Sequence, residues 1–252
     1  MSTQFAMYPS LQGKHIFITG GASGIGESLV RHFHLQSAHV SFLDIAKSEG
    51  EALARELEPT VRFFHCDVRN IAALQECLQM AISQYGPIRV LINNAARDDR
   101  HDVQTFSSED WDRCQEINLK PYFFTSQAVV YSMQKAGGGS IINISSNSYI
   151  LMVGGMPGYL TAKAGIVGLT RALARDLGCK NIRVNSILPG WIMTKRQEEM
   201  WLTPEAEKEL LKSQCLGVKL YPPDVARLAL FLAADDSSMI TAQAYTVDGG
   251  RT

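Results

Sequence analysis

Short apolar runs alternate along the chain with longer stretches in which apolar residues recur at every third or fourth position. The short runs predict buried β-strands, and the periodic stretches predict amphipathic α-helices. We expect strands at residues 16–18, 39–43, 61–66, 88–92, 141–144, 182–187 and 244–247. We expect helices after residue 26 and at residues 48–57, 71–85, 111–135, 159–177 and 225–234. This alternation is typical of an α/β fold, here a doubly wound parallel sheet with helices on both faces.

No linker, internal repeat or low-complexity segment interrupts the alternation, so we expect a single domain over residues 1–252. A chain of 252 residues suits one α/β domain with a large core. Residues 191–220 differ from the rest, because they are more polar and carry two tryptophans among many glutamates and lysines. We expect this segment to form a flap over a cleft, although an ordinary surface excursion has the same composition.

The composition excludes several classes of protein. A formal net charge of −1 with 19% charged residues leaves no excess of lysine and arginine for nucleic acid or an anionic membrane. The five cysteines are scattered, odd in number and without a CxxC pair, so we expect neither a disulfide framework nor a metal site. No signal-peptide pattern and no apolar stretch of about 18 residues is present. We therefore expect a soluble cytoplasmic protein.

Residues 13–26 read GKHIFITGGASGIG and predict the first strand, a glycine-rich turn and the start of a helix. Gly20 allows a tight turn out of the strand, Gly24 lets a pyrophosphate approach the backbone, and Gly26 lets the helix pack closely on the sheet. The free N–H groups and the positive dipole end of the helix then face the anion. Many strand-to-helix turns carry glycines for backbone reasons alone, so this motif needs a second observation.

Asp44, at the end of the second predicted strand, supplies that observation, because dinucleotide sites carry an acidic residue about twenty positions after the glycines. A carboxylate there accepts hydrogen bonds from both ribose hydroxyls and repels a 2′-phosphate. Asp44 therefore predicts NAD rather than NADP. Ser23 and Ile45 stand where an NADP enzyme needs a cation, and Lys47 is close in sequence. These features predict a Rossmann-type fold whose nucleotide-binding half covers about residues 11–150.

Several polar residues stand at the carboxyl ends of the predicted strands, where open α/β sheets bind their ligands. Tyr159 and Lys163 are four residues apart on one predicted helix and so share a face. A tyrosine, with a pKa near ~10, is a poor base at neutral pH, but an ammonium group one turn away favours the phenolate. Ser146, at a strand end, is placed to hydrogen-bond the reacting oxygen. Such a Tyr/Lys pair alone is usually structural, and it gains weight from the glycine motif and Asp44.

In these motifs the chain resembles the short-chain dehydrogenase/reductases over nearly its whole length. The resemblance covers the glycine loop at residues 19–26, the family's NNAG motif at residues 93–96, Asp67 on the adenine side, and Pro189-Gly190 after the sixth strand. Ala96 replaces the last glycine of NNAG, which narrows the space near the cofactor but removes no chemical group. The resemblance implies a catalytic tetrad of Asn118, Ser146, Tyr159 and Lys163. It implies cofactor contacts from Gly20, Ser23, Gly24, Ile25, Gly26, Asp44, Asp67, Val68, Asn94, Tyr159, Lys163, Pro189, Gly190, Ile192 and Thr194.

The resemblance also implies an oxidoreductase acting on CH–OH groups. Tyr159 would take the proton of an alcohol while hydride leaves the same carbon for the nicotinamide. Lys163 would bind the nicotinamide ribose and lower the tyrosine pKa, and Ser146 would hold the substrate oxygen. Asn118 would position a water in the proton relay. From the residues alone, Ser146 could instead cap the next segment, and Asn118 could satisfy a carbonyl at a helix bend.

Four polar segments, at residues 95–102, 193–197, 201–207 and 213–216, resemble those of family members that oxidise aldoses at C1 to lactones. A sugar needs several hydrogen-bonding groups and an aromatic face around it. The expected substrate contacts are Ser146, Asn147, Tyr159, Arg97, Arg100, His101, Arg196, Gln197 and Trp201. Individually, these charged residues are equally compatible with a solvated loop or an inter-subunit contact.

Two other functions stay open at this point. The first keeps the chemistry but acts on another polyol, a secondary alcohol or a 3-oxoacyl group. The second is a catalytically idle dinucleotide-binding sensor or scaffold, against which the intact Tyr159–Lys163 pair argues. We also expect a homotetramer, partly from the resemblance and partly because the helices at residues 111–135 and 159–177 are apolar on more than one face.

Overall fold

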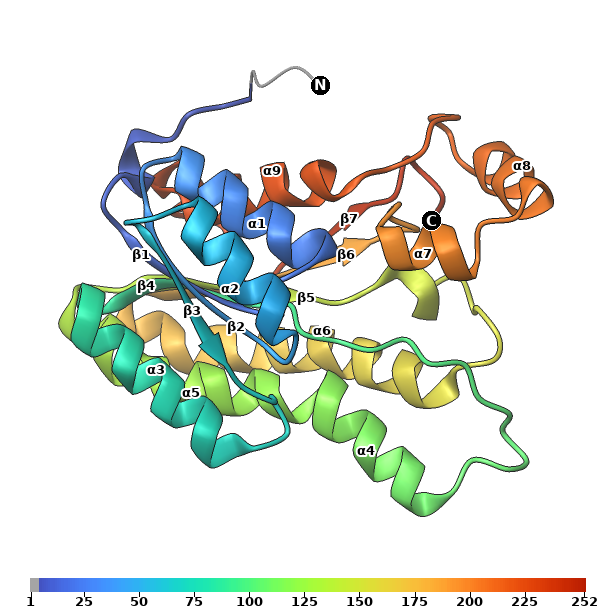
Figure 1. Cartoon of the computed structure of the whole chain (residues 1–252), viewed down its shortest axis with the longest axis horizontal. Coiled ribbons are helices and arrows are strands. Elements are labelled where there is room, and N and C mark those ends of the chain that lie inside the picture. The colour runs from blue at the N-terminus through green and yellow to red at the C-terminus, as the bar shows by residue number, and fades with distance from the viewer. Residues whose placement is uncertain (1–4) are drawn as a thin grey trace.

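In a computed structural model that describes residues 5–252, seven strands form one sheet in the order β3-β2-β1-β4-β5-β6-β7 (Figure 1). Every neighbouring pair is parallel. The strands are β1 (His15–Thr19), β2 (His39–Asp44), β3 (Val61–His65), β4 (Ile88–Asn93), β5 (Gly139–Ile144), β6 (Ile182–Pro189) and β7 (Ala244–Val247). The doubly wound parallel sheet predicted from the alternating pattern is confirmed.

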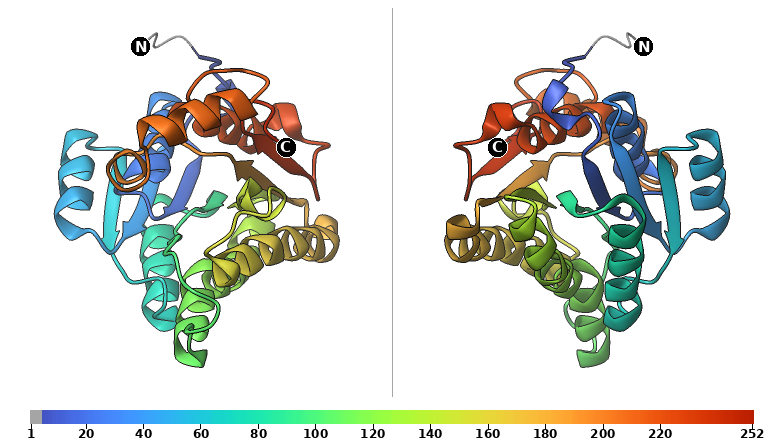
Figure 2. Two further views of the ribbon diagram at one scale, coloured as in Figure 1. Left: turned by 90° about the vertical axis from the view of Figure 1, so that its right-hand side faces the viewer. Right: turned by 90° about the vertical axis from the view of Figure 1, so that its left-hand side faces the viewer.

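Helices connect the strands and cover both faces of the sheet (Figure 2). The α-helices are α1 (Gly24–Leu35), α2 (Lys47–Glu56), α3 (Ile71–Tyr85), α4 (Ser108–Asn118), α5 (Lys120–Lys135), α6 (Pro157–Leu177), α7 (Lys195–Met200), α8 (Pro204–Ser213) and α9 (Pro222–Ala233). The 3₁₀ helices are η1 (Pro9–Leu11), η2 (Asn147–Tyr149), η3 (Gly178–Lys180) and η4 (Asp235–Ser237). The strand order reverses between β1 and β4, and a crevice at the carboxyl ends of such strands is where ligands bind.

Two apolar clusters, one on each face, hold the layers together. Along β1, Ile16 and Ile18 join the cluster under α1, α2 and α9, whereas Phe17 joins the one under α3, α5 and α6. The two sets separate because successive side chains of a strand point to opposite faces. All three residues have no exposed surface. The rigid, doubly covered sheet thus sets the positions of the loops at its carboxyl end.

One prediction about the helices is wrong. The pattern over residues 111–135 predicted a single helix, but α4 ends at Asn118 and α5 begins at Lys120, with Leu119 between them at φ −132° and ψ −53°. Pro121 explains the break, because it has no N–H and its ring clashes with the carbonyl four residues earlier in a continuous helix. Apolar periodicity carries across this bend, which is why the pattern alone did not reveal it.

The segment expected as a flap leaves the sheet after β6 and contains α7 and α8 before the chain returns at α9 (Figure 1). Its two ends are joined: Ile192 and Leu220 form an isolated parallel bridge, and the Met193 N–H donates to the Leu220 carbonyl at 2.8 Å. Leu210 of α8 is only 1% exposed and anchors the segment from inside.

Within residues 5–252, no helix combines the length and apolar character that crossing a membrane requires.

Candidate active site

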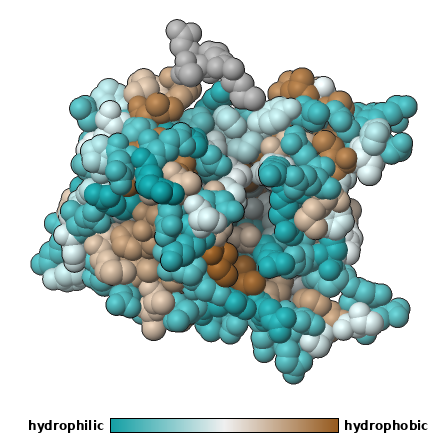
Figure 3. Space-filling model, in the orientation of Figure 1, coloured by the Kyte–Doolittle hydropathy of each residue, from teal (hydrophilic) through white to brown (hydrophobic). Residues whose placement is uncertain are grey.

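A cleft of about 1310 Å³ opens at the carboxyl ends of the strands. The space-filling view shows it as a hollow between the region of α1 and α2 and that of α7, on a mostly hydrophilic face (Figure 3). Ordinary ligand pockets enclose roughly 300–1,000 Å³. The cleft is therefore large enough for a dinucleotide together with a small second molecule.

The glycine loop forms one end of this cleft. Gly20 adopts φ +68°, a left-handed conformation that side chains rarely adopt, and a methyl group built on Gly26 would collide with the carbonyl oxygen of Gly20. Ser23 precedes α1 without capping it through its side chain, so the first N–H groups of the helix are left for a ligand. Such a helix start binds anions, and the loop therefore fits a pyrophosphate.

Asp44 stands beside the glycine loop at the end of β2. Its carboxylate accepts hydrogen bonds from the Ala22 and Ala46 N–H groups, both at 3.0 Å, and the residue lines the cleft. These two bonds fix the carboxylate while leaving acceptor capacity for ribose hydroxyls. Lys47 does not line the cleft, and its ammonium lies 3.9 Å from Glu51. The nearest lysine in sequence thus lies outside the cleft lining that includes Asp44.

Asp67 and Val68 line the cleft where the adenine is expected. The Asp67 carboxylate is held by Arg69, whose Nη2 lies 2.5 Å from Oδ2. Hydrogen bonds from the Arg69 side chain lower the pKa of Asp67, so it stays ionised. Arg69 also lines the cleft, and the sequence analysis did not anticipate it.

Asn94, expected to contact the cofactor, lines the cleft but has a structural task as well. Its side-chain amide donates to the carbonyls of Thr19 at 3.1 Å and Gly20 at 2.8 Å, and so ties the end of β4 to the glycine loop. Ala96, the departure from the family motif, is exposed and also lines the cleft. The remaining expected cofactor residues that line the cleft are Ser23, Gly24, Ile25, Pro189, Gly190, Ile192 and Thr194.

Tyr159 and Lys163 lie one turn apart on α6 and face the same part of the cleft. Lys163 is 1% exposed, its ammonium donates to the Ile144 carbonyl at 2.9 Å, and it lies 5.5 Å from the centre of the Tyr159 ring. Ser146 follows the end of β5 and bonds to the Ser148 hydroxyl, and it caps η2 by accepting from the Ser148 N–H at 3.2 Å. The three expected catalytic side chains therefore meet at one place, although Ser146 also has the capping role that the residues alone had left open.

Burial has the largest effect on the pKa values of Tyr159 and Lys163. Burial raises the pKa of Tyr159 above its usual value, and the Asp98 charge acts in the same direction, while a hydrogen bond with Ser146 and the Arg100 charge oppose them. Burial also lowers the pKa of Lys163 to about 7, although Asp98 opposes this change. The resemblance implied that Lys163 lowers the pKa of Tyr159. In the protein without cofactor, the pKa of Tyr159 is raised instead, because desolvation is the larger effect.

Asn118, the fourth tetrad residue, lies at the end of α4 and is 1% exposed. Its amide donates to the carbonyls of Arg97 and Cys114, both at 3.0 Å, and its oxygen accepts from the Arg97 N–H at 2.8 Å. Asn118 does not line the cleft. The contacts match the alternative that it satisfies carbonyls at a helix bend, and they fix the loop after β4. Its proposed role toward a water stays a prediction.

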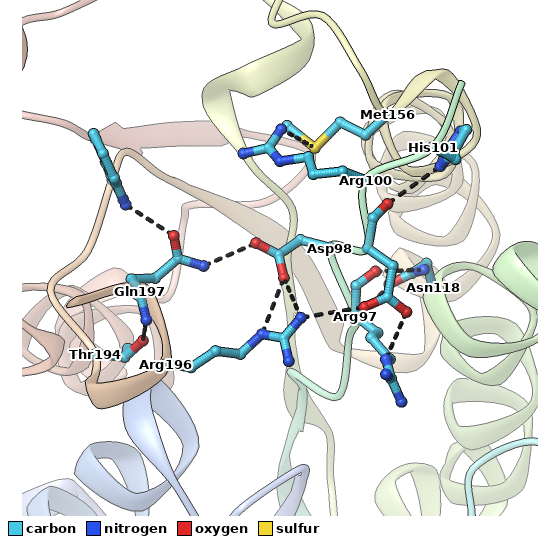
Figure 4. Close-up of polar contacts among 11 residues, drawn as sticks. Arg97, Asp98, Arg100, His101, Asn118, Met156, Thr194, Arg196 and Gln197 are labelled. Atoms are coloured by element: carbon cyan, nitrogen blue, oxygen red, sulfur yellow. Dashed lines mark hydrogen bonds and ion pairs between the residues drawn. The ribbon is translucent and has the colours of Figure 1, made fainter. Parts of the chain in front are cut away.

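The loop after β4 meets the flap through a network of polar contacts (Figure 4). The Asp98 carboxylate accepts from the Gln197 amide at 2.8 Å and pairs with the Arg196 guanidinium at 3.3 Å. Gln197 in turn accepts from the Trp191 indole N–H at 2.8 Å. Arg196 also pairs with Asp99 at 3.2 Å. These contacts thus join the loop after β4 to α7, and both segments line the same cleft as Ser146, Tyr159 and Lys163.

Most of the expected substrate residues line this end of the cleft, namely Arg97, Arg100, Ser146, Asn147, Tyr159, Arg196, Gln197 and Trp201. The Arg100 guanidinium lies 5.1 Å from the centre of the Trp201 ring, and the Trp201 indole N–H has no acceptor among the described residues. The Asn147 amide donates to Asp248 at 2.9 Å, which leaves its oxygen free for other contacts. This part of the site therefore offers donors, acceptors and an aromatic ring.

His101, expected to contact the substrate, lies elsewhere. It does not line the cleft; its ring stacks on Phe106 with centroids 3.7 Å apart, and Nε2 accepts from the Gly158 N–H at 3.2 Å. It therefore braces the start of α6, and the structure gives no support for a substrate contact.

Sequence reasoning did not single out several residues of the site. Asp98 and Asp99 lie inside a segment it had marked as polar, yet only their pairing across the cleft distinguishes them from the neighbouring charges. Asp248 accepts from Asn147 and from the N–H groups of residues 250–252, and so holds the end of the chain against the site. Burial alone would raise the pKa of Asp248, but these bonds outweigh it and keep the pKa below its usual value. No motif in the sequence pointed to this role.

Comparison with known proteins agrees with this geometry. Residues 20–252 match the family model described as enoyl-(acyl carrier protein) reductase. The fold superimposes on a short-chain type dehydrogenase/reductase from Mycobacterium ulcerans with a TM-score of 0.92, covering 96% of this chain and 90% of the other at 25% identity. The chain belongs to the short-chain dehydrogenase/reductase family. As a member of this family, it is an oxidoreductase that acts on CH–OH groups with a nicotinamide cofactor.

Among curated family members, two sugar dehydrogenases resemble the chain over almost its full length. A protein named probable galactose dehydrogenase GalD, from Rhizobium meliloti, is 44% identical over 254 residues, covering 99% of both chains. D-xylose 1-dehydrogenase from Caulobacter vibrioides is 45% identical over 249 residues, covering 97% of this chain and 98% of the other. A 3-oxoacyl-[acyl-carrier-protein] reductase from Chlamydia pneumoniae is 36% identical, covering 96% and 98% of the two chains. The chain is thus more similar in sequence to these two sugar dehydrogenases than to this 3-oxoacyl reductase.

Within residues 5–252, no group of three histidine, cysteine, aspartate or glutamate side chains is arranged to hold a metal ion.

Proposed function

We propose that this protein is an NAD-dependent aldose 1-dehydrogenase, which oxidises the C1 hydroxyl of an aldose to the corresponding lactone. The observation that carries the proposal is the 44–45% identity to a probable galactose dehydrogenase and a D-xylose 1-dehydrogenase over nearly the whole chain. The polar end of the cleft supports it, because guanidinium groups and amides suit a hydroxylated substrate. A steroid or acyl chain would leave many of these groups without partners.

The residues of the site suit this reaction. Ser146 holds the C1 oxygen, and Tyr159 takes its proton as the C1 carbonyl forms. When bound, the oxidised nicotinamide would supply the acceptor for the hydride from C1, and the overall reaction would convert aldose and NAD to lactone, NADH and one proton. Lys163 holds the nicotinamide ribose and contributes the positive charge of its ammonium beside the Tyr159 phenolate. Because the Lys163 ammonium is buried, water screens this charge weakly.

We further propose that NAD is preferred to NADP. Asp44 is fixed by two backbone N–H groups, so its charge cannot turn away from a 2′-phosphate. Ser23 and Ile45, which line the cleft beside it, carry no positive charge, and the Arg69 guanidinium in the same cleft is paired with Asp67. We also propose a cytoplasmic location, because all five cysteines are free thiols, as is usual in a reducing compartment. Cell fractionation tests the location.

A substrate panel tests the proposed reaction. NADH formation is followed by absorbance with D- and L-aldoses, with the corresponding alditols and with a secondary alcohol, and the reverse reaction is followed with a 3-oxoacyl thioester. We expect turnover with at least one aldose and none with its alditol, because an alditol has no C1 hemiacetal. Hydroxylamine added during turnover should trap the lactone before it hydrolyses. If every aldose is inert and an alditol, secondary alcohol or 3-oxoacyl compound reacts well, the sugar assignment is wrong.

A further inference from the structure

Lys163 lies between two tyrosines, of which the proposed reaction uses one. Its ammonium is 5.5 Å from the centre of the Tyr159 ring and 5.4 Å from the centre of the Tyr122 ring. It donates to the Tyr122 hydroxyl oxygen at 3.3 Å and to the Ile144 carbonyl at 2.9 Å. An ammonium group has three N–H donors. Two are therefore directed by these acceptors, and one is left for the cofactor side of the cleft.

Tyr122 is itself held firmly. It is 1% exposed, and its hydroxyl donates to the same Ile144 carbonyl at 3.0 Å. Its backbone carbonyl accepts from the Ser126 hydroxyl at 2.7 Å and from Asn93 at 3.4 Å. Burial raises the pKa of Tyr122 well above its usual value, so the phenol stays neutral. The hydroxyl is thus a fixed, uncharged acceptor for the lysine.

The bend between α4 and α5 brings Tyr122 to this place. Tyr122 lies in the first turn of α5, and its N–H donates to the Leu119 carbonyl at the bend, at 3.1 Å. Tyr122 does not line the cleft, so its hydroxyl acts on the site through its neighbours: Lys163, the Ile144 carbonyl and, at 3.5 Å, the Ala95 carbonyl.

We propose that Tyr122 is a positioning residue for Lys163, whose hydroxyl fixes the direction of the ammonium and stabilises its charged form. The charged form needs this help, because burial lowers the pKa of Lys163 to about 7. An acceptor on the ammonium opposes that change, and removing it should lower the pKa further. The role is independent of which alcohol the enzyme oxidises, so it does not rest on the sugar substrate.

The test is a pH titration of Lys163 by NMR in protein labelled with ¹⁵N-lysine and without cofactor. Lys163→Met identifies the signal. Tyr122→Phe keeps the ring and its packing and removes only the hydroxyl, whereas Tyr131→Phe makes the same change at an exposed position of the same helix. We expect the pKa of Lys163 to fall in Tyr122→Phe and to stay unchanged in Tyr131→Phe.

NADH affinity, measured by fluorescence titration across pH, provides a second readout. Tyr122→Phe should weaken NADH binding roughly tenfold at neutral pH, the scale expected when a charged group loses a hydrogen bond, and less at lower pH, where Lys163 is protonated in both proteins. An unchanged Lys163 pKa overturns the proposal, even if the variant binds NADH less tightly. Failure of Tyr122→Phe to fold also overturns it, since the hydroxyl would then be a structural requirement.

Discussion

In the proposed function, Asp44 selects the cofactor and Tyr159 takes the proton of the substrate. Each depends on a charge in a fixed position. The Asp44 carboxylate is held by the Ala22 and Ala46 N–H groups. Tyr159 is held on α6 beside Lys163 and Ser146. Substitution of either residue should therefore change one function and leave the other nearly intact.

Asp44→Ala should narrow the preference for NAD over NADP. A like-charge contact between a carboxylate and a 2′-phosphate typically costs several kcal/mol, and the variant removes it together with the hydrogen bonds to the ribose. We expect kcat/KM with NAD to fall and kcat/KM with NADP to change less. Glu51→Ala, on the exposed side of α2, is the control. A wild-type enzyme that prefers NADP would contradict this role for Asp44.

Tyr159→Phe should abolish turnover, by at least roughly a hundredfold, because it removes the hydroxyl that takes the proton. NAD binding, measured by titration, should be nearly unchanged. In the wild-type enzyme the oxidation rate should increase with pH, because the phenolate is the active form and burial raises the pKa of Tyr159. Substantial activity in Tyr159→Phe would require another base.

The buried Lys163 should make stability depend on pH in a defined window. Its pKa is lowered from 10.5 to about 7 in the folded protein, so between these values the unfolded chain binds more protons at this residue. The free energy of unfolding therefore increases with pH between 7 and 10 because of this group, and the gain is lost again as the pH falls from 10 to 7. Urea unfolding should show a flatter pH dependence for Lys163→Met than for the wild type. The exposed Lys47→Met should keep the wild-type slope.

At the scale of elements, the site depends on two segments that meet across the cleft. The loop after β4 is held by Asn118 on one side and, through Asp98, contacts Arg196 and Gln197 of α7 on the other. The base of the flap is closed by the bridge between Ile192 and Leu220. Motion of the flap would thus require the Asp98 contacts to break, while its base stays in place.

Asp98→Asn should make α7 and α8 open more often. The variant loses the charge that pairs with Arg196, and a partly exposed ion pair contributes about 1 kcal/mol or less. Hydrogen exchange of residues 195–213 should become up to roughly fivefold faster, which corresponds to this energy. Asp102→Asn, in the same loop but outside the cleft, is the matched control. Equal exchange in both variants would show that Asp98 does not hold the flap.

For the whole molecule, we predict a homotetramer. The outer surfaces of α4 and α5 carry exposed aromatic residues, with Trp111 38%, Phe123 42% and Tyr131 72% exposed. A helix that is apolar on several sides is usually buried on several sides. Light scattering should give four times the chain mass of 27.8 kDa, and Tyr131→Glu should lower it if α5 lies in the interface. A monomer at micromolar concentration would contradict the prediction.

The sequence by itself determined how strands and helices alternate along the chain. It also determined the glycine loop, the position of Asp44 after the second strand, and the shared helix face of Tyr159 and Lys163. These features depend on periodicity and on neighbours within one turn or one βα unit, so they can be read locally. The alternation also determined that the sheet is parallel, because strands joined through helices pair in this way.

Only the tertiary structure decided the contacts between distant segments. Asp98 and Gln197 are 99 residues apart, and Tyr122 and Lys163 are 41 apart, so no local pattern could pair them. The bend at Leu119 escaped the helical pattern because apolar spacing survives a break of one residue. His101 looked like its polar neighbours, and the packing of its ring on Phe106 removed it from the cleft. Such contacts arise when packed elements bring side chains together, which depends on the whole sheet rather than on any one segment.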